Sequence, residues 1–276
     1  MNQSNKPILR PSRVLKKLRA GQVASCVKLN LGDARAAEIA AACGVDCIWL
    51  DMEHVPNSIE AIENQIRAAK MHDVDALVRT RRGSYSDLVL PLEMDAAGIM
   101  VPHIMSAEDA RKVAWQSKFH PIGRRALDGG NADGAYCAVS VEQYIAHANA
   151  ERFVIVQIED PEPLSDLEQI AATDGIDMLF FGPGDFSQGI GRPGQFDDPR
   201  IADARQRVAA AAKKHKKFAG TVGSIASLPS LQELGYQFIS IGADVVALRE
   251  YFANIAAAFG KQTTSAAEGV YSGKQK

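Results

Sequence analysis

The sequence predicts one α/β domain folded as a (β/α)₈ TIM barrel. Its 276 residues match the usual length of such a barrel. Eight short apolar runs alternate with longer segments of helical periodicity, and no shift in composition divides the chain. The runs are almost continuously apolar, which is typical of parallel strands with helices on their outer face. They cover residues 23–29, 47–51, 76–79, 98–101, 153–158, 178–181, 218–222 and 238–242.

The limits of the domain follow from the same pattern. We expect an N-terminal arm over residues 1–13, the barrel over 14–260, and a polar, disordered tail over 261–276. A doubly wound open sheet is the alternative fold. It is disfavoured because no G-x-G-x-x-G segment follows the first predicted strand.

Several predicted helices carry start and stop signals. Asn57 or Ser58 is placed to cap one helix, and Ser106 with Asp109 has the pattern of a capping box before another. Pro199 suits the first turn of a third helix, which ends in a run of lysines. Cations interact favourably with the C-terminal end of a helix, so we interpret this run as a solvated helix end.

Composition limits the possible partners and location. With 31 basic and 33 acidic residues the net charge is −2, and no basic stripe suggests nucleic-acid binding. No apolar stretch reaches the ~18 residues of a membrane span, and residues 1–13 lack the apolar core of a signal peptide. Without a C-x-x-C pair, the cysteines are expected to be buried, reduced thiols in a cytoplasmic protein. They are Cys26, Cys43, Cys47 and Cys137.

Polar side chains gather at the C-terminal ends of the predicted strands, where TIM barrels carry their active sites. Each alone has an ordinary structural explanation, such as a loop cap or an exposed charge. Together they would converge on one mouth of the barrel, which favours a catalytic site. The residues are Lys28, Asp51 with His54, Arg79, Gln157 with Glu159, and Gly184 with Asp185.

Two of these carboxylates indicate a metal site. Glu159 and Asp185 would supply two hard oxygen ligands, which leaves the other positions of an octahedral ion to water and substrate. This pattern suits Mg²⁺ or Mn²⁺, whereas zinc would need more histidine or cysteine. A 2-oxo acid could chelate the open positions, and the ion would stabilise an enolate. His54, oriented by Asp51, could transfer a proton, and Arg79 could bind an oxyanion.

Five short motifs carry a resemblance to a known family. They are WLDMEH at 49–54, LVR at 77–79, GIMVP at 98–102, QIED at 157–160 and FGPGDFS at 181–187. In this order, and at strand ends, they closely resemble the HpcH/HpaI aldolases, the class II pyruvate aldolases. The resemblance runs from about Val14 to Phe259, nearly the whole chain.

The resemblance implies an activity and the residues that carry it. Members of the family cleave a 4-hydroxy-2-oxo acid reversibly into pyruvate and an aldehyde, with Mg²⁺, Mn²⁺ or Co²⁺ bound. The implied residues are Glu159 and Asp185 as metal ligands, His54 with Asp51 as the acid/base pair, and Arg79, Gln157, Gly184 and Asp185 as contacts to pyruvate.

The resemblance also implies an assembly. The family packs its last helix against a partner subunit, usually in a hexamer that is a trimer of dimers. An acidic residue from a neighbouring subunit reaches the site, and Glu93 occupies that position in this sequence.

The sequence departs from the family at two places that are expected to line the binding region of the aldehyde. Lys28 stands where much of the family has a tryptophan. Residues 123–136 are similar to the branch that contains macrophomate synthase. We hypothesise that Lys28, together with Arg124 or Arg125, binds an additional anionic or polyhydroxylated acceptor.

Other functions stay open at this point. A Schiff-base aldolase could use Lys28 as its nucleophile, but Glu159 and Asp185 would then have no role. An oxaloacetate decarboxylase would pass through the same enolate. An acyl-CoA lyase of the same superfamily would share the carboxylates and would need a CoA groove, of which the sequence gives no clear sign. A non-catalytic barrel would not need this set of residues together.

Overall fold

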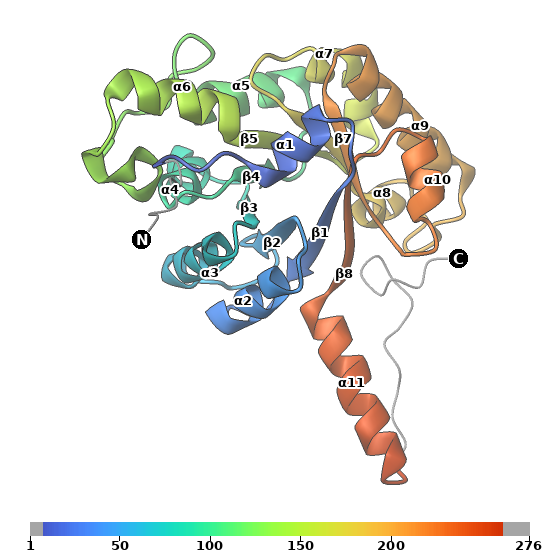
Figure 1. Ribbon diagram of the computed structural model, residues 1–276. Coiled ribbons are helices and arrows are strands. Elements are labelled where there is room, and N and C mark those ends of the chain that lie inside the picture. The colour runs from blue at the N-terminus through green and yellow to red at the C-terminus, as the bar shows by residue number, and fades with distance from the viewer. Residues whose placement is uncertain (1–7, 262–276) are drawn as a thin grey trace.

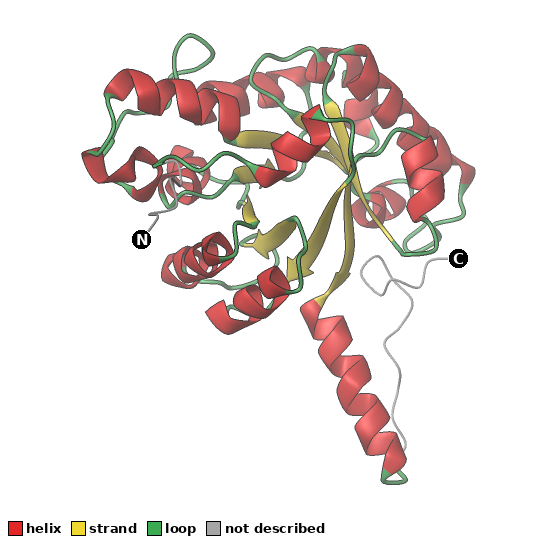
Figure 2. Cartoon of the chain, in the orientation of Figure 1, coloured by secondary structure: helices red, strands yellow, loops and turns green. Residues whose placement is uncertain are grey.

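The computed structural model describes residues 8–261 as a closed barrel of eight parallel strands surrounded by helices (Figure 1, Figure 2). The strands pair in chain order, and β8 closes the barrel against β1. This confirms the predicted fold, and each strand lies within one residue of its expected bounds. The strands are β1 Ala24–Leu29, β2 Cys47–Asp51, β3 Asp75–Arg79, β4 Gly98–Val101, β5 Phe153–Ile158, β6 Met178–Phe181, β7 Phe218–Gly223 and β8 Phe238–Ala243.

The helices begin largely where the sequence signals place them. The Ser58 hydroxyl accepts a hydrogen bond from the Ala61 N–H, and Pro199 opens α9. Only half of the predicted capping box forms, because the Asp109 carboxylate accepts from the Met105 N–H instead of from Ser106. The helical segments are α1 Arg13–Arg19, α2 Ala34–Ala42, α3 Ile59–Met71, α4 Tyr85–Glu93, α5 Ala107–Ser117, η1 Ala132–Cys137, α6 Val141–Glu151, η2 Glu162–Ser165, α7 Leu167–Ala171, α8 Pro183–Gly189, α9 Pro199–Lys214, α10 Leu228–Glu233 and α11 Asp244–Ala258.

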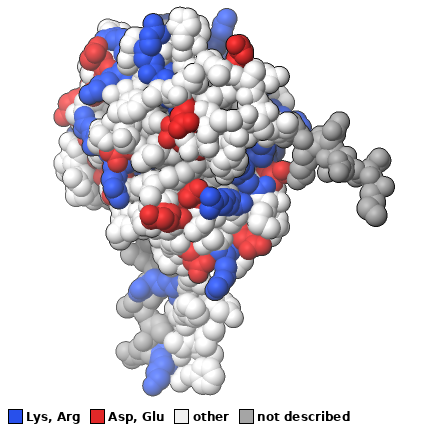
Figure 3. Space-filling view, turned by 90° about the vertical axis from the view of Figure 1, so that its left-hand side faces the viewer, with Lys and Arg blue, Asp and Glu red and all other residues white. Residues whose placement is uncertain are grey.

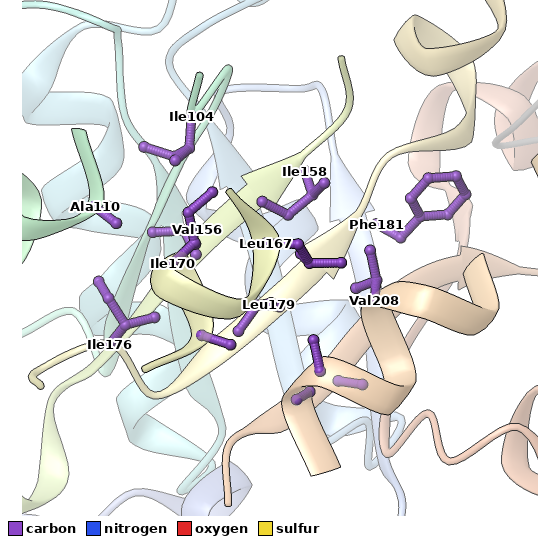
Figure 4. Packing of buried hydrophobic residues seen from close by; sticks show 14 of the residues in the cluster. Ile104, Ala110, Val156, Ile158, Leu167, Ile170, Ile176, Leu179, Phe181 and Val208 are labelled. Atoms are coloured by element: carbon purple, nitrogen blue, oxygen red, sulfur yellow. The ribbon is translucent and has the colours of Figure 1, made fainter. Parts of the chain in front are cut away.

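Burial on both faces explains why the strands are almost continuously apolar. Every residue of β2 to β6 is buried. Inside the barrel, the rings of Trp49, Phe180 and Phe238 pack edge to face, with centroids 5.7 and 6.3 Å apart. On the outer face, side chains of β5 and β6 meet those of α5, α7 and α9 in one apolar cluster (Figure 4). Because side chains fill the interior of the barrel, a ligand can bind only at one of its ends.

Part of the predicted N-terminal arm belongs to the barrel. Asp75 is fully buried at the start of β3. It accepts hydrogen bonds from the Ser12 hydroxyl at 2.6 Å and from the Val14 N–H at 2.9 Å. These contacts hold α1 against the N-terminal end of the barrel. Residues 1–7 and the predicted tail beyond Lys261 lie outside the described residues.

The last helix leaves the barrel instead of packing on it. Figure 1 shows α11 continuing from the end of β8 and projecting away from the strands. None of its residues is buried. It therefore leaves large apolar side chains exposed at helical spacing, namely Val245, Leu248, Tyr251, Phe252 and Ile255, followed by Phe259. Apolar side chains exposed in such a row are typical of a surface that packs against another element.

The surface agrees only in part with the expectations about partners and location. Figure 3 shows basic and acidic side chains interspersed on one face of the molecule. Within residues 8–261, no helix is long and apolar enough to cross a membrane. All four cysteines are free, and Cys26 and Cys47 are buried as predicted. Cys43 and Cys137 are exposed, contrary to the prediction, because they lie at the ends of α2 and of the short 3-10 helix η1.

Candidate active site

A pocket of about 220 Å³ opens at the C-terminal ends of the strands. A larger cavity of about 750 Å³ lies beside α1 at the other end of the barrel, but its arginines are already paired with aspartates. We therefore place the site in the smaller pocket, where the predicted residues converge. It is lined by His54, Arg79, Gln157, Glu159, Gly184 and Asp185, together with Trp49, Phe180, Gly182, Pro183 and Val222.

Asp51 lies directly beneath this pocket in a buried ion network. Its two oxygens accept from the Arg79 guanidinium at 3.0 and 2.6 Å, and its Oδ2 lies 2.9 Å from Lys28 Nζ. Burial alone would raise the pKa of the Asp51 carboxyl, but Arg79 and Lys28 hold it well below its usual range. Burial lowers the pKa of Lys28, with Asp51 opposing the shift. The network fixes the Arg79 guanidinium, whose Nη1 also reaches Glu53 at 2.9 Å.

The expected side-chain pair between His54 and Asp51 does not form. Asp51 accepts only the main-chain N–H of His54, at 3.4 Å. The His54 side chain is 54% exposed at the pocket rim, with its Nε2 3.6 Å from Glu53. The physical reason is that Asp51 is already bound by the side chains of Lys28 and Arg79 on the neighbouring strands. Asp51 thus orients Arg79 and not the His54 ring.

Glu159 stands at the end of β5, only 1% exposed. Its Oε1 accepts the His103 N–H at 2.8 Å, and its Oε2 accepts from the Gln157 amide. Burial, with the nearby Glu53 and Asp185 carboxylates, raises the pKa of Glu159 to about 7 despite the hydrogen bond from His103. A cation beside Glu159 would therefore stabilise the charged form of this buried carboxylate.

Gly182 allows the next strand to approach Glu159 closely. A Cβ at this position would lie 2.7 Å from Glu159 Cβ and 2.8 Å from its Oε2. Any other residue would push the start of α8, and with it Asp185, away from Glu159. The glycine in the predicted FGPGDFS motif is therefore required by packing at the site.

Three residues at the mouth were given no role by the sequence analysis: Glu53 and Asp160, which lie beside predicted residues at strand ends, and His103, which was missed. His103 follows β4 and lies between the others, with Nδ1 2.8 Å from Asp160 and Nε2 3.6 Å from Glu53. The signal that could have found it was positional. Of the first six predicted strands, only the fourth had no polar residue assigned to its end, and His103 is the second residue after that strand.

The chemistry of this pocket fits a divalent cation. Glu53, His103 and Glu159 each offer a ligand atom, and these atoms lie within 4.8 Å of one another. Gln157 is buried, and its Oε1 has no hydrogen-bond partner among the described residues. The charge is also unbalanced, since two basic side chains, Lys28 and Arg79, face a larger set of carboxylates. These carboxylates are Asp51, Glu53, Glu159, Asp160 and Asp185.

Two predicted residues lie at the opposite end of the barrel. Arg125 is buried and donates to Asp133 at 2.6 Å and to Tyr144 at 3.3 Å. Its segment follows a helix, α5, and leads into β5, so it lies at the N-terminal ends of the strands. Arg125 therefore does not line the pocket of its own chain. Glu93 ends α4 near the same loop, where burial raises its pKa against the effect of Arg125.

Fold and site together define a (β/α)₈ barrel with an acidic pocket at its mouth, whose carboxylates and histidine could hold a cation. A family model described as HpcH/HpaI aldolase/citrate lyase matches residues 26–250. The chain belongs to this family, whose named relatives are aldolases, a class of carbon–carbon lyase.

Individual relatives agree with this assignment. The chain is 32% identical to a 2-keto-3-deoxy-L-rhamnonate aldolase of Klebsiella pneumoniae over 76% of this chain and 79% of the relative. It is 29% identical to a hydroxypyruvate/pyruvate aldolase of Pseudomonas aeruginosa, covering 94% and 98%. Among solved structures, an HpcH/HpaI aldolase from Desulfitobacterium hafniense superposes with a TM-score of 0.84 at 28% identity, covering 92% and 98%. Macrophomate synthase is also a structural neighbour, with a TM-score of 0.79 at 26% identity, covering 92% and 91%.

Proposed function

We propose that this protein is a divalent-metal-dependent aldolase that reversibly cleaves a 4-hydroxy-2-oxo acid into pyruvate and an aldehyde. One observation carries the proposal: Glu159 and Asp185 line the same pocket as Arg79 and Gln157. Carboxylates for a cation and donors for a 2-oxo acid thus face one small space. The names of the relatives, which include a hydroxypyruvate/pyruvate aldolase, support the same class of reaction.

Glu159 and Asp185 would hold the ion, which we expect to be Mg²⁺, Mn²⁺ or Co²⁺. Both are oxygen ligands on adjacent elements, the end of β5 and the first turn of α8. When bound, such an ion supplies Lewis-acid stabilisation of the negative charge that develops as the carbon–carbon bond breaks.

The other pocket residues would bind and orient the 2-oxo acid. Arg79 presents fixed donors because Asp51 holds its guanidinium from below at two points. The N–H groups of Gly184 and Asp185 would donate hydrogen bonds to the carboxylate of the substrate, and Gln157 would bind the same half of the molecule. His54, half-exposed at the rim, would exchange a proton with a substrate hydroxyl.

A Schiff-base route through Lys28 is disfavoured. Its lowered pKa would help nucleophilic attack, but Nζ lies 2.9 Å from Asp51 beneath the pocket and the side chain is only 4% exposed. Lys28 is not among the residues that line the pocket. An indirect influence of Lys28 on the choice of aldehyde, through Asp51 and Arg79, stays part of the proposal.

Exchange of the pyruvate methyl protons tests the proposed chemistry directly. With Mn²⁺ or Mg²⁺ and deuterated water, the protein is expected to exchange these protons, because enolate formation does not need the aldehyde. Proton NMR of the pyruvate methyl signal follows the reaction. EDTA should stop the exchange and added Mn²⁺ should restore it, whereas borohydride should not trap pyruvate on the protein. Exchange that persists in EDTA, with covalent trapping at Lys28, would contradict the metal route.

We also propose that the protein is a cytoplasmic homo-oligomer, a hexamer built as a trimer of dimers. The free cysteines suit a reducing compartment. The exposed apolar side chains of α11 support assembly, since a helix with no buried residue is unstable alone in water. Glu93 would then reach the pocket of a neighbouring subunit.

The oligomer prediction concerns the mass in solution. Light scattering after size exclusion is expected to give about six times the 29.7 kDa of one chain. Replacing Leu248 and Phe252 with aspartate should dissociate the assembly, because charges would be buried at the interface. A wild-type protein that elutes as a monomer would refute the assembly and leave the metal chemistry to be judged separately.

A further inference from the structure

His103 has an unusual backbone position beside the proposed cation site. It directly follows Pro102 after β4 and has a φ of 48°, in the left-handed region. Residues other than glycine rarely adopt this conformation, and asparagine, aspartate and histidine are the usual exceptions. In this conformation the His103 N–H donates to Glu159 Oε1 at 2.8 Å. The backbone at His103 therefore acts on a residue that we propose as a metal ligand.

The His103 ring holds the residue next to that ligand. Nδ1 lies 2.8 Å from Asp160 Oδ2 and 3.8 Å from Glu159 Oε1, and Nε2 lies 3.6 Å from Glu53. One imidazole thus lies among three carboxylates, and two of them are consecutive in the chain. Histidine–carboxylate pairs of this kind commonly surround metal ligands in proteins and fix their orientation.

We propose that His103 is a positioning residue of the cation site, whose N–H and Asp160-held ring together fix the Glu159 carboxylate toward the ion. The inference rests on the proposed metal-dependent function and adds a residue to it. With the Gln157 amide on Oε2, each oxygen of Glu159 receives one hydrogen bond and keeps a second lone pair for the ion. Loss of such outer partners typically weakens metal binding by about 10- to 100-fold.

Two substitutions separate the ring from the backbone. His103→Gly accepts the left-handed φ without strain but removes the ring. His103→Asn also tolerates this φ, and its side-chain nitrogen stands where Nδ1 of histidine stands, so it can still donate to Asp160. Mn²⁺ binding to the metal-stripped full chain is measured by calorimetry and by the EPR signal of free Mn²⁺. We expect His103→Gly to bind Mn²⁺ roughly tenfold more weakly than the wild type, and His103→Asn to bind it within about threefold of the wild type.

A second variant and a control complete the test. Asp160→Ala removes the oxygen that holds the ring at 2.8 Å without changing the left-handed residue, and it should weaken Mn²⁺ binding as His103→Gly does. His215→Gly removes another histidine bound to a carboxylate, Glu168, at 2.8 Å but far from the pocket, and it should leave Mn²⁺ binding unchanged. Circular dichroism of each metal-free variant checks that it is folded.

The outcomes distinguish this inference from the proposed function. If the wild type binds Mn²⁺ and His103→Gly binds it equally well, the positioning role is wrong and the metal site stands. If His103→Asn binds Mn²⁺ as weakly as His103→Gly does, the side-chain contact with Asp160 does not support metal binding, and the inference also fails. If the wild type binds no divalent cation, the proposed function fails and the positioning role fails with it.

Discussion

Replacing Glu159 with glutamine is expected to lower kcat/KM for aldol cleavage by roughly 10³-fold or more, equal to about 4 kcal/mol of transition-state stabilisation. Glutamine keeps the size of the side chain and can still accept the His103 N–H, which Glu159 receives at 2.8 Å. It carries no negative charge, so the ion would lose one of its two proposed carboxylate ligands. Pyruvate release measured at saturating Mn²⁺ checks the loss of activity, and calorimetry checks the loss of metal binding.

A matched substitution shows whether the effect belongs to the site. Glu168 is an exposed glutamate on α7 that pairs with Lys214 at 2.8 Å, outside the pocket. Glu168→Gln should retain wild-type activity, because an exposed pair contributes about 0–1 kcal/mol and touches no pocket residue. A Glu159→Gln variant that keeps more than about a tenth of the activity would place the essential cation elsewhere.

The fold and most of the pocket were predictable because they depend on local pattern and on barrel topology. Strands buried on both faces leave long apolar runs, and the polar residues that end them must meet at one mouth. Glu159, Asp185, Arg79 and Gln157 were found in this way and share one pocket. Topology could also have placed Arg125 correctly, since a segment that follows a helix and precedes a strand lies at the other end of the barrel.

Side-chain pairing was harder to predict because it depends on register between strands. Asp51 and Arg79 are direct partners across β2 and β3, so the guanidinium meets the carboxylate at the same height. His54 is closer to Asp51 in sequence but lies in the loop beyond it. His103 was missed for a related reason, since only the folded chain brings its ring between Glu53 and Asp160.

The family resemblance implied that the last helix packs against a partner subunit, but the apolar pattern of α11 alone does not predict its course. Its apolar residues recur at helical spacing, which would suit packing on its own barrel equally well. Only the direction that the chain takes after β8 decides between its own barrel and a partner, and Figure 1 shows that it turns outward.

The buried ion network beneath the pocket leads to the second large effect, which is on stability. Asp51 is fully buried, and Lys28 and Arg79 are 4% and 1% exposed. Asp51→Asn leaves two buried cations with too little negative charge, and removing one member of a buried ion pair costs about 3–5 kcal/mol. For a chain of this size, the unfolding temperature should fall by roughly 6–20 °C. Differential scanning fluorimetry of the metal-free protein measures this change.

A double-variant cycle identifies the cause of that loss. Lys28→Met alone should cost little, because Asp51 keeps both hydrogen bonds to Arg79 and the buried lysine had itself been desolvated. In Lys28→Met/Asp51→Asn, the remaining Arg79 is balanced by Glu53, 2.9 Å from its Nη1. The double variant should therefore be more stable than Asp51→Asn, with a coupling of about 1–3 kcal/mol. If the losses of stability in the two single variants simply add up in the double variant, Lys28 and Asp51 contribute independently. In that case the charge of Lys28 does not stabilise the buried Asp51 carboxylate.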